Sequence, residues 1–299
     1  MFQKLSDLEK AIKHSGERKT LALAVSHDKH SLGAIARAYQ QNFIIPIFVG
    51  DELKTKEYIK ELGLKFGNEV RFIDEHEDNE AVRIAVTLVS SGKAQFLMKG
   101  KVATPYLLKG VLNKEWGLRT GRLLSHLAYF EVENYHKLIG ITDVAMNIAP
   151  NLQDKIQIVN NSVAFLNKIG VPEPKVAVLG AIEMVNENMQ ATLDAALLSK
   201  MQERDQIKNC VIDGPLAFDN AISSESAKHK NIKSKVAGDT DILVMPDIEV
   251  GNVLYKSLVF FAKAHAASVI LGAAAPIVLT SRSDSEDSKY YSILLAALG

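Results

Sequence analysis

Cysteine is almost absent from the 299-residue chain, with Cys210 as its single copy. This excludes an intramolecular disulfide and any zinc site built on two or four thiolates. Because Cys210 begins the short apolar run CVID, we interpret it as a small core residue rather than a nucleophile. The chain also lacks a G-x-S-x-G nucleophile elbow, so nothing in it indicates a serine hydrolase.

Long apolar runs are missing too. The nearest approach, residues 264–280, is interrupted by Gly272 and Pro276, and a membrane span needs about 18 consecutive apolar residues. The first residues, MFQKLSDLEKAIKH, are amphipathic and charged and hold no apolar run of signal-peptide length. The sequence therefore predicts a soluble, cytoplasmic protein without a membrane partner.

An excess of charge of either sign is lacking, because 35 Lys and Arg residues match 35 Asp and Glu residues. Nucleic-acid-binding proteins carry a basic excess, so we expect no nucleic-acid partner. Hydrophobic residues make up 47% and charged residues 23%, which is typical of a globular chain with enough apolar surface to fold. This length predicts roughly two domains.

Short β-branched runs alternate with longer amphipathic stretches, which is typical of parallel βαβ units. The expected strands are residues 20–25, 44–49, 70–73, 96–98, 175–179, 210–212, 241–245, 268–271 and 277–280. The expected helices are residues 29–41, 51–62, 79–91, a helix starting at Thr104, and residues 154–169, 188–201, 252–265 and 284–298. Between Gly121 and Met146 two longer strands follow each other directly, which predicts a β-hairpin or antiparallel edge and a domain boundary.

Ligands of parallel α/β sheets bind beyond the carboxyl ends of the strands, so polar residues that directly follow strands are candidate site residues. They are Ser26-His27-Asp28, Lys99-Gly100-Lys101, Thr142-Asp143, Asp213-Gly214-Pro215, Pro246-Asp247 and Thr280-Ser281-Arg282-Ser283-Asp284.

The strongest of these groups is the last, where an apolar strand runs into TSRSDSEDS and then into a helix. A helix N-terminus attracts anions, and the planar fork of Arg282 suits phosphate oxygens. Ser283, Asp284 and Ser285 are also favoured helix caps. Capping does not explain Arg282 at the end of the strand, so we favour an anion site here.

The turn Lys99-Gly100-Lys101 is a second cationic cluster. Glycine permits close approach of a ligand to the backbone, and the helix at Thr104 presents N–H donors. A solvated turn with surface lysines explains the same residues equally well, and both interpretations stay open. Neither the phosphate loop of nucleotide hydrolases nor the dinucleotide fingerprint G-x-G-x-x-G occurs in the chain.

Metal-ligating patterns are weak. His27 and His30 have only Asp28 as a local third ligand, and we expect no metal site there. Four acids flank the strand at 241–245, and we interpret them as turn residues. They are Asp239, Asp241, Asp247 and Glu249. The strand-to-helix turn at 249–252 nevertheless stays a candidate site wall.

Five segments, taken together and in order, resemble the phosphate acetyl/butyryltransferase family, most closely its butyryltransferase branch. They are MKGKVATPYLLKGVLNKE, ITDVAMNIAPNLQDKIQIVNNSV, IDGPLAFDNAIS, VAGDTDILVMPDIEVGNVLYKSL and GAAAPIVLTSRSDSEDSKYYSI. The resemblance implies two α/β domains with mostly parallel sheets flanking a cleft, similar to the isocitrate and isopropylmalate dehydrogenases. Domain one would be residues 1–139 plus 272–299, and domain two residues 140–271. The family also implies a homodimer or a higher homo-oligomer.

The implied reaction is reversible transfer of a butyryl or similar short or branched acyl group between coenzyme A (CoA) and orthophosphate. Acyl-CoA and phosphate would be substrates, and no tightly bound cofactor is implied. Arg282 matches the phosphate-binding arginine, and Ser281 the serine that stabilises the sulfur or developing negative charge. A downstream aspartate takes the thiol proton in the family, but its position falls on Ser288 here. Asp284 and Asp287 are the available carboxylates, and we favour Asp287.

We expect further residues, most of them chosen for their places at strand ends and helix starts, to contact the substrates. They are Lys99, Gly100, Thr104, Lys109, Asp213, Gly214, Pro215, Glu249, Gly251, Asn252 and Ser283. Lys109 stands where acetyl enzymes carry a phosphate-contacting arginine, and it keeps the charge without the fork.

Three alternative functions remain. They are phosphate acetyltransferase, a metal- and nicotinamide-dependent decarboxylating dehydrogenase of the same fold, and an inactive phosphate- or CoA-binding regulatory protein. No metal triad can be assembled for the dehydrogenase, and the presence of Ser281, Arg282 and nearby acids favours an enzyme over the regulatory protein.

Overall fold

The computed structural model describes residues 2–280 and 284–299. The chain forms two compact units, which we call the first unit (residues 6–122 and 267–299) and the second unit (residues 1–5 and 123–266). The predicted domains are residues 1–139 plus 272–299 and residues 140–271. In the prediction, as in the two units, the C-terminal segment returns to the part of the chain that holds the first strands, but the predicted boundaries lie at other residues. As independently folding domains they stay a prediction.

The sheet of the first unit has the strand order β3-β2-β1-β4-β11-β10. Its strands are β1 (Lys19–Ala24), β2 (Ile44–Gly50), β3 (Arg71–Asp74), β4 (Phe96–Lys99), β10 (His265–Leu271) and β11 (Ile277–Val278). The strands β3, β2, β1, β4 and β11 are each parallel to their neighbours in this list. Strand β10 is antiparallel to β11.

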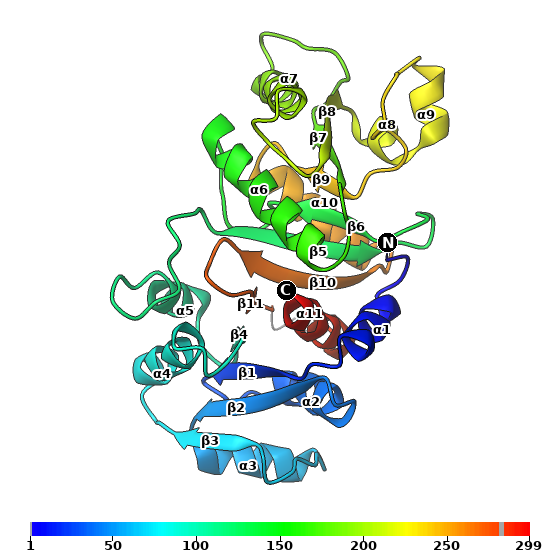
Figure 1. Ribbon diagram of the computed structural model, residues 1–299. Coiled ribbons are helices and arrows are strands. Elements are labelled where there is room, and N and C mark those ends of the chain that lie inside the picture. The colour runs from blue at the N-terminus through cyan, green and yellow to red at the C-terminus, as the bar shows by residue number, and fades with distance from the viewer. Residues whose placement is uncertain (1, 281–283) are drawn as a thin grey trace. The chain divides into compact units, whose positions relative to one another are not determined.

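Helices cover both faces of this sheet (Figure 1). They are α1 (Ser6–Ser15), α2 (Lys29–Gln40), α3 (Glu52–Glu61) and α11 (Glu286–Leu298) on one face, and α4 (Asp78–Ser90) and α5 (Thr104–Val111) on the other. With both faces covered, a central parallel strand must be apolar throughout. Strand β1 meets this requirement over its last four residues, since the side chains from Leu21 to Ala24 are fully buried.

The second unit contains strands in the order β5-β6-β9-β7-β8. They are β5 (Ser125–Glu131), β6 (Ile139–Thr142), β7 (Lys175–Leu179), β8 (Val211–Leu216) and β9 (Ile242–Val244). Strand β5 is antiparallel to β6, and the other neighbours are parallel. The helices are α6 (Leu152–Lys168), α7 (Gln190–Glu203), α8 (Phe218–Ile222), α9 (Ser224–His229) and α10 (Ile248–Phe260). Helices α6 and α7 lie on one face and α10 on the other (Figure 1).

The predicted α/β class with mostly parallel strands is confirmed, and so is the antiparallel hairpin, formed by β5 and β6. Two predicted elements have boundaries that are wrong by about four residues or more. The strand predicted at 210–212 continues to Leu216, so Asp213, Gly214 and Pro215 lie within β8 instead of after it.

The helix predicted at 252–265 begins and ends earlier, at Ile248 and Phe260. It begins earlier because the Asp247 side chain caps it, accepting a hydrogen bond from the Val250 N–H at 2.9 Å. It ends earlier because Lys263 has a positive φ of 49°, and His265 already belongs to β10. Glu249, Gly251 and Asn252 therefore lie inside the helix rather than in the turn before it.

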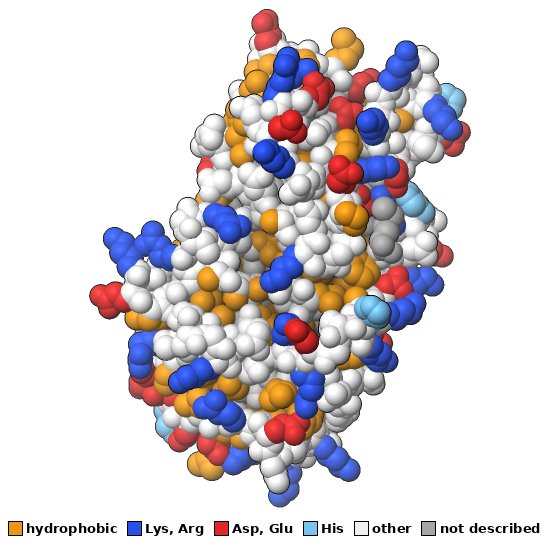
Figure 2. Space-filling model, in the orientation of Figure 1, with side chains coloured by type: hydrophobic (Ala, Val, Ile, Leu, Met, Phe, Trp, Pro, Cys, Tyr) orange, Lys and Arg blue, Asp and Glu red, His pale blue; other side chains and the backbone are white. Residues whose placement is uncertain are grey.

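Within residues 2–280 and 284–299, every helix is too short or too polar to cross a membrane. On the face shown in Figure 2, Lys and Arg side chains lie among Asp and Glu side chains, as the equal numbers of the two charge types imply.

Candidate active site

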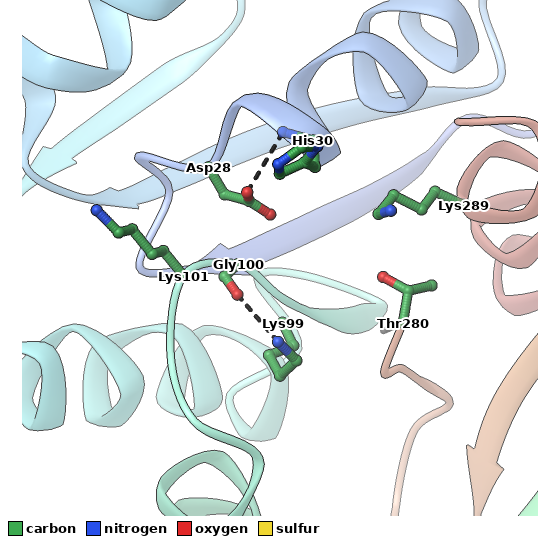
Figure 3. Close-up of a pocket in the computed structure, with 7 residues that line it drawn as sticks. All are labelled: Asp28, His30, Lys99, Gly100, Lys101, Thr280 and Lys289. Carbon is green, nitrogen blue, oxygen red and sulfur yellow. Dashed lines mark hydrogen bonds between the residues drawn. The ribbon is translucent and has the colours of Figure 1, made fainter. Parts of the chain in front are cut away.

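The order of the strands in the first unit locates its most favourable binding position. Strands β2 and β3 lie on one side of β1, and β4 lies on the other side. At such a switch point, crossover helices leave the sheet in opposite directions and open a crevice beyond the carboxyl ends of the strands. A small pocket occurs there, and seven residues line it (Figure 3). They are Asp28, His30, Lys99, Gly100, Lys101, Thr280 and Lys289.

The turn after β4 forms one wall of this pocket. The N–H groups of Gly100 and Lys101 donate to the carbonyl oxygens of Ala24 and Val25, both at 2.9 Å. A Cβ atom on Gly100 would lie 2.2 Å from the Val25 oxygen, so only glycine allows this close approach to β1. The Nζ of Lys99 donates to the carbonyl oxygens of Gly100 and Val102, at 3.2 and 3.3 Å. The predicted cationic turn thus lies in the pocket wall.

Asp28 brings a carboxylate into the pocket from the start of α2. Its Oδ1 accepts the His30 N–H at 3.3 Å, and its Oδ2 accepts the Ser31 hydroxyl at 2.5 Å. This is an N-terminal cap, which holds the carboxylate in one place. Burial and the nearby Lys101 charge lower the pKa of the adjacent His27, which favours the neutral imidazole.

Lys289 contributes a buried cation from the first turns of α11. The residue is 2% exposed, and its Nζ donates to the carbonyl oxygen of Asp284. Burial lowers the pKa of Lys289, while the carboxylates of Asp284 and Asp28 oppose that shift. The pocket therefore holds three lysines and one carboxylate, together with the Thr280 hydroxyl. Such a site favours a small anion.

Ser281, Arg282 and Ser283, which carry the strongest sequence prediction, lie outside the described residues. Of their two neighbours in the chain, one lines this pocket and the other is bonded to a lining residue. Thr280 lines the pocket, and Asp284 is bonded by Lys289.

The two predicted carboxylates differ in their surroundings. Asp287 is exposed and forms an ion pair with Arg37, with 2.5 Å between Oδ1 and Nη1. Arg37 in turn lies over the Tyr290 ring, 3.7 Å from its centroid. Asp284 is half-buried and interacts with Lys289. Of these two acids, Asp284 has the closer connection to the pocket.

The remaining predicted residues of the first unit lie on α5, and neither lines the pocket in Figure 3. Thr104 is the first residue of this helix and is half-buried, and Lys109 is exposed in its last turn.

In the second unit, the predicted residues on α10 hold the loop that follows β6. A Cβ atom on Gly251 would lie 2.3 Å from the carbonyl oxygen of Asp143, and the Asn252 side chain donates to the Val144 carbonyl at 3.3 Å. The buried Asp143 carboxylate accepts the N–H groups of Ala145 and Met146 at 2.8 and 2.9 Å. These contacts fix the backbone of the loop.

Of the other predicted residues in the second unit, Glu249 is exposed in the first turn of α10. Asp213, Gly214 and Pro215 extend β8, where the Asp213 Oδ1 accepts the Gly214 N–H at 2.8 Å.

Two of the four acids considered as cation ligands have basic partners. Asp239 pairs with Lys137 and Lys175, and Asp241 pairs with Lys137. In the described part of the chain, no three His, Cys, Asp or Glu side chains gather as metal ligands would.

Sequence reasoning missed Lys289. The one signal was a lysine directly before the run Tyr290–Ala297, in which almost every side chain is buried. Its link to Asp28 depends on the packing of α11 against α2, which no local pattern reveals.

Known proteins resemble this chain over most of its length. Residues 77–297 match the family described as phosphate acetyl/butaryl transferase. A phosphate butyryltransferase of Clostridium beijerinckii is 47% identical over 280 residues, which cover 94% of this chain and 92% of that protein. A phosphate acetyltransferase of Thermotoga maritima is 46% identical over 292 residues, covering 97% and 99%. The chain therefore belongs to the phosphate acetyl/butaryl transferase family.

Solved structures give the same result. A branched-chain phosphotransacylase from Enterococcus faecalis matches with a TM-score of 0.83 and 34% identity, over 94% of this chain and 98% of that one. The EutD phosphotransacetylase from Staphylococcus aureus has a TM-score of 0.79 at 21% identity, over 98% of both chains, and this likeness concerns the fold alone.

Proposed function

We propose that this chain is a phosphate acyltransferase that moves a butyryl or similar short or branched acyl group reversibly between CoA and orthophosphate. Membership of the family supports the reaction class. The observation that carries the proposal is the cationic pocket at the carboxyl ends of β1 and β4, which three lysines and one carboxylate line. Orthophosphate is a small dianion of the kind that such a pocket stabilises. The dehydrogenase alternative has no comparable support.

In the proposed reaction a phosphate oxygen attacks the thioester carbonyl, the C–S bond breaks, and CoA leaves as the thiolate, which then takes up a proton. The Arg282 fork orients the phosphate, and the Ser281 hydroxyl donates to the developing negative charge. In the reverse direction a carboxylate takes the proton of the CoA thiol. The ion pair between Asp287 and Arg37 supports Asp284 as that base.

The other residues that the sequence points to remain proposed substrate contacts. They are Lys99, Gly100, Thr104, Lys109, Asp213, Gly214, Pro215, Glu249, Gly251, Asn252 and Ser283. The location of Lys99 and Gly100 in the pocket wall supports a phosphate contact for these two.

The Arg282→Ala variant tests the proposal. We expect its kcat/KM for phosphate-dependent CoA release from butyryl-CoA to fall about 100-fold or more, because it loses a bidentate donor to the transferred group. CoA release is read with a thiol reagent. Arg282→Lys keeps the charge without the fork and should recover a part of the loss. Arg83→Ala, on the exposed side of α4, is the control. A wild-type rate in Arg282→Ala would contradict the assignment.

The acyl preference is decided by a series of acyl-CoA substrates from C2 to C6, straight and branched, at varied phosphate. One methylene group in an apolar pocket contributes about 1–3 kcal/mol, so a butyryl enzyme should turn acetyl-CoA over measurably more slowly. Equal rates would make the chain a phosphate acetyltransferase.

We further propose a cytoplasmic homodimer or higher homo-oligomer with a fold akin to the isocitrate and isopropylmalate dehydrogenases. Exposed apolar side chains on and just after α10 support self-association. They are Val250, Val253, Phe260 and Phe261. Sedimentation velocity at micromolar concentration tests the oligomeric state, and a single monomer boundary would contradict it.

A further inference from the structure

Lys289 is the most deeply buried charged group in the pocket. It follows the exposed first turn of α11 and precedes the buried Tyr290, at 2% exposure. Lysine is almost never buried to this degree unless other groups stabilise its charge. Here the Nζ donates to the carbonyl oxygen of Asp284, and the carboxylate of Asp28 faces the same pocket.

The bond to Asp284 has a consequence for the chain nearby. Asp284 directly follows the segment 281–283, and Thr280, directly before it, lines the pocket together with Lys289. A single side chain of α11 is thereby connected to the main chain at the end of the segment that carries Ser281 and Arg282.

The second consequence concerns charge. The carboxylate of Asp28 is fixed at the start of α2 by its capping bonds, so it cannot turn away from a bound anion without loss of the cap. With Lys289 present, three lysines and one carboxylate line the pocket. Without it only Lys99 and Lys101 remain, and Lys101 is exposed, so its charge is screened by solvent.

Building on the proposed function, we propose that Lys289 is a positioning residue for the phosphate substrate. Its ammonium group ties the main chain of Asp284 to α11 and offsets the charge of Asp28, so that the pocket accepts a dianion. No bond to Lys289 forms or breaks in the reaction. The residue acts through the main chain of Asp284, to which it is bonded, and through the carboxylate that it balances.

The test compares Lys289→Met with Lys289→Arg. Methionine fills a similar volume without charge, and the acids near Lys289, Asp28 and Asp284, are only half-buried, so its loss leaves no fully buried charge uncompensated. We expect Lys289→Met to raise the Kd of inorganic phosphate, measured by calorimetry without acyl-CoA, at least tenfold. The KM for phosphate should rise in parallel, while the KM for acyl-CoA stays within twofold. The Kd of phosphate for Lys289→Arg should stay within about threefold of the wild-type value. The Kd for Lys56→Met, which changes the surface of α3, should equal the wild-type value.

A second variant isolates the charge effect. Asparagine caps a helix about as well as aspartate, so Asp28→Asn removes the carboxylate without removing the cap. In the Lys289→Met background this change should recover at least half of the lost phosphate affinity on a logarithmic scale.

Several outcomes would overturn the proposal. They are wild-type phosphate affinity in Lys289→Met, an equal rise of both KM values with a lowered melting temperature, no rescue by Asp28→Asn, or no phosphate binding by the wild-type protein. Absence of acyl transfer in a wild-type protein that binds phosphate would instead refute the proposed function and leave the role of Lys289 measurable by binding.

Discussion

Gly100 shows how one residue type shapes the pocket. Its N–H and that of Lys101 continue the pairing of β4 with β1, and the space for a Cβ atom is taken by the Val25 carbonyl at 2.2 Å. Because the obstacle is main chain rather than a mobile side chain, the turn itself has to move if any side chain is added. The lysines on either side of Gly100 would move with it.

We expect Gly100→Ala to lower the free energy of unfolding by about 1–3 kcal/mol, the usual effect of overpacking, and to raise the KM for phosphate. Gly33→Ala on α2 is a matched control, because its added Cβ would meet only the flexible, exposed carboxylate of Glu286. That control should be neutral or slightly stabilising, since alanine favours helix. Thermal unfolding and phosphate kinetics measure both variants, and equal stability in the two would contradict the expectation.

Among the elements, α6 and α7 are joined by a buried ion pair. The Nζ of Lys155 lies 2.6 Å from Oδ2 of Asp194, and both side chains are less than 5% exposed. Gln190 donates to the other carboxylate oxygen of Asp194 at 2.8 Å. Loss of one partner in such a pair leaves the other as an uncompensated buried charge.

Asp194→Asn should therefore lower the free energy of unfolding by about 3–5 kcal/mol, seen as a lower urea midpoint. The exposed pair Lys200–Glu203 on the same helix provides the comparison, and Glu203→Gln should change stability by about 0.5 kcal/mol or less. A shift in Asp194→Asn no larger than that in Glu203→Gln would disprove the argument.

Most elements could be predicted because apolar runs such as residues 20–25 are bounded by clear helix caps and turns. The end of β8 was missed because Gly214-Pro215 is typical of a turn, whereas pairing with β7 keeps it in the sheet. At the site, the cationic turn 99–101 follows from its place after a strand. Asp28 and Lys289 become neighbours only through tertiary packing, so their relation could not be read from either segment.

For the whole molecule, charge balance depends on pH. Below pH 4 the acids become protonated while the 35 Lys and Arg charges remain, so repulsion within the chain increases. Asp239 adds a specific contribution. Burial alone would raise its pKa, but hydrogen bonds from Lys137, Lys175 and His136 outweigh burial, and the pKa of this carboxyl is lowered below 3.8.

A carboxyl whose pKa is lowered in the folded state stabilises the fold at pH values above its unfolded-state pKa of 3.8. This stabilisation is lost as the pH falls through the folded-state pKa. We expect the urea midpoint of the wild-type protein to fall steeply between pH 4 and pH 2. The urea midpoint of the control Glu187→Gln, which changes an exposed side chain, should fall by about the same amount. Asp239→Asn should start less stable at pH 7 and show a flatter decline. Parallel curves for all three proteins would refute the contribution of Asp239.

Cys210 has a practical consequence for experiments on this protein. Burial, together with the charge of Glu173, raises the pKa of its thiol to about 11, so at pH 7 about one such thiol in ten thousand is ionised. Maleimides and disulfide reagents should therefore leave the native chain unlabelled. A cysteine introduced at the exposed pocket residue His30 would be the one reactive thiol. A fluorophore attached there would report the arrival of phosphate optically, without prior removal of the native cysteine.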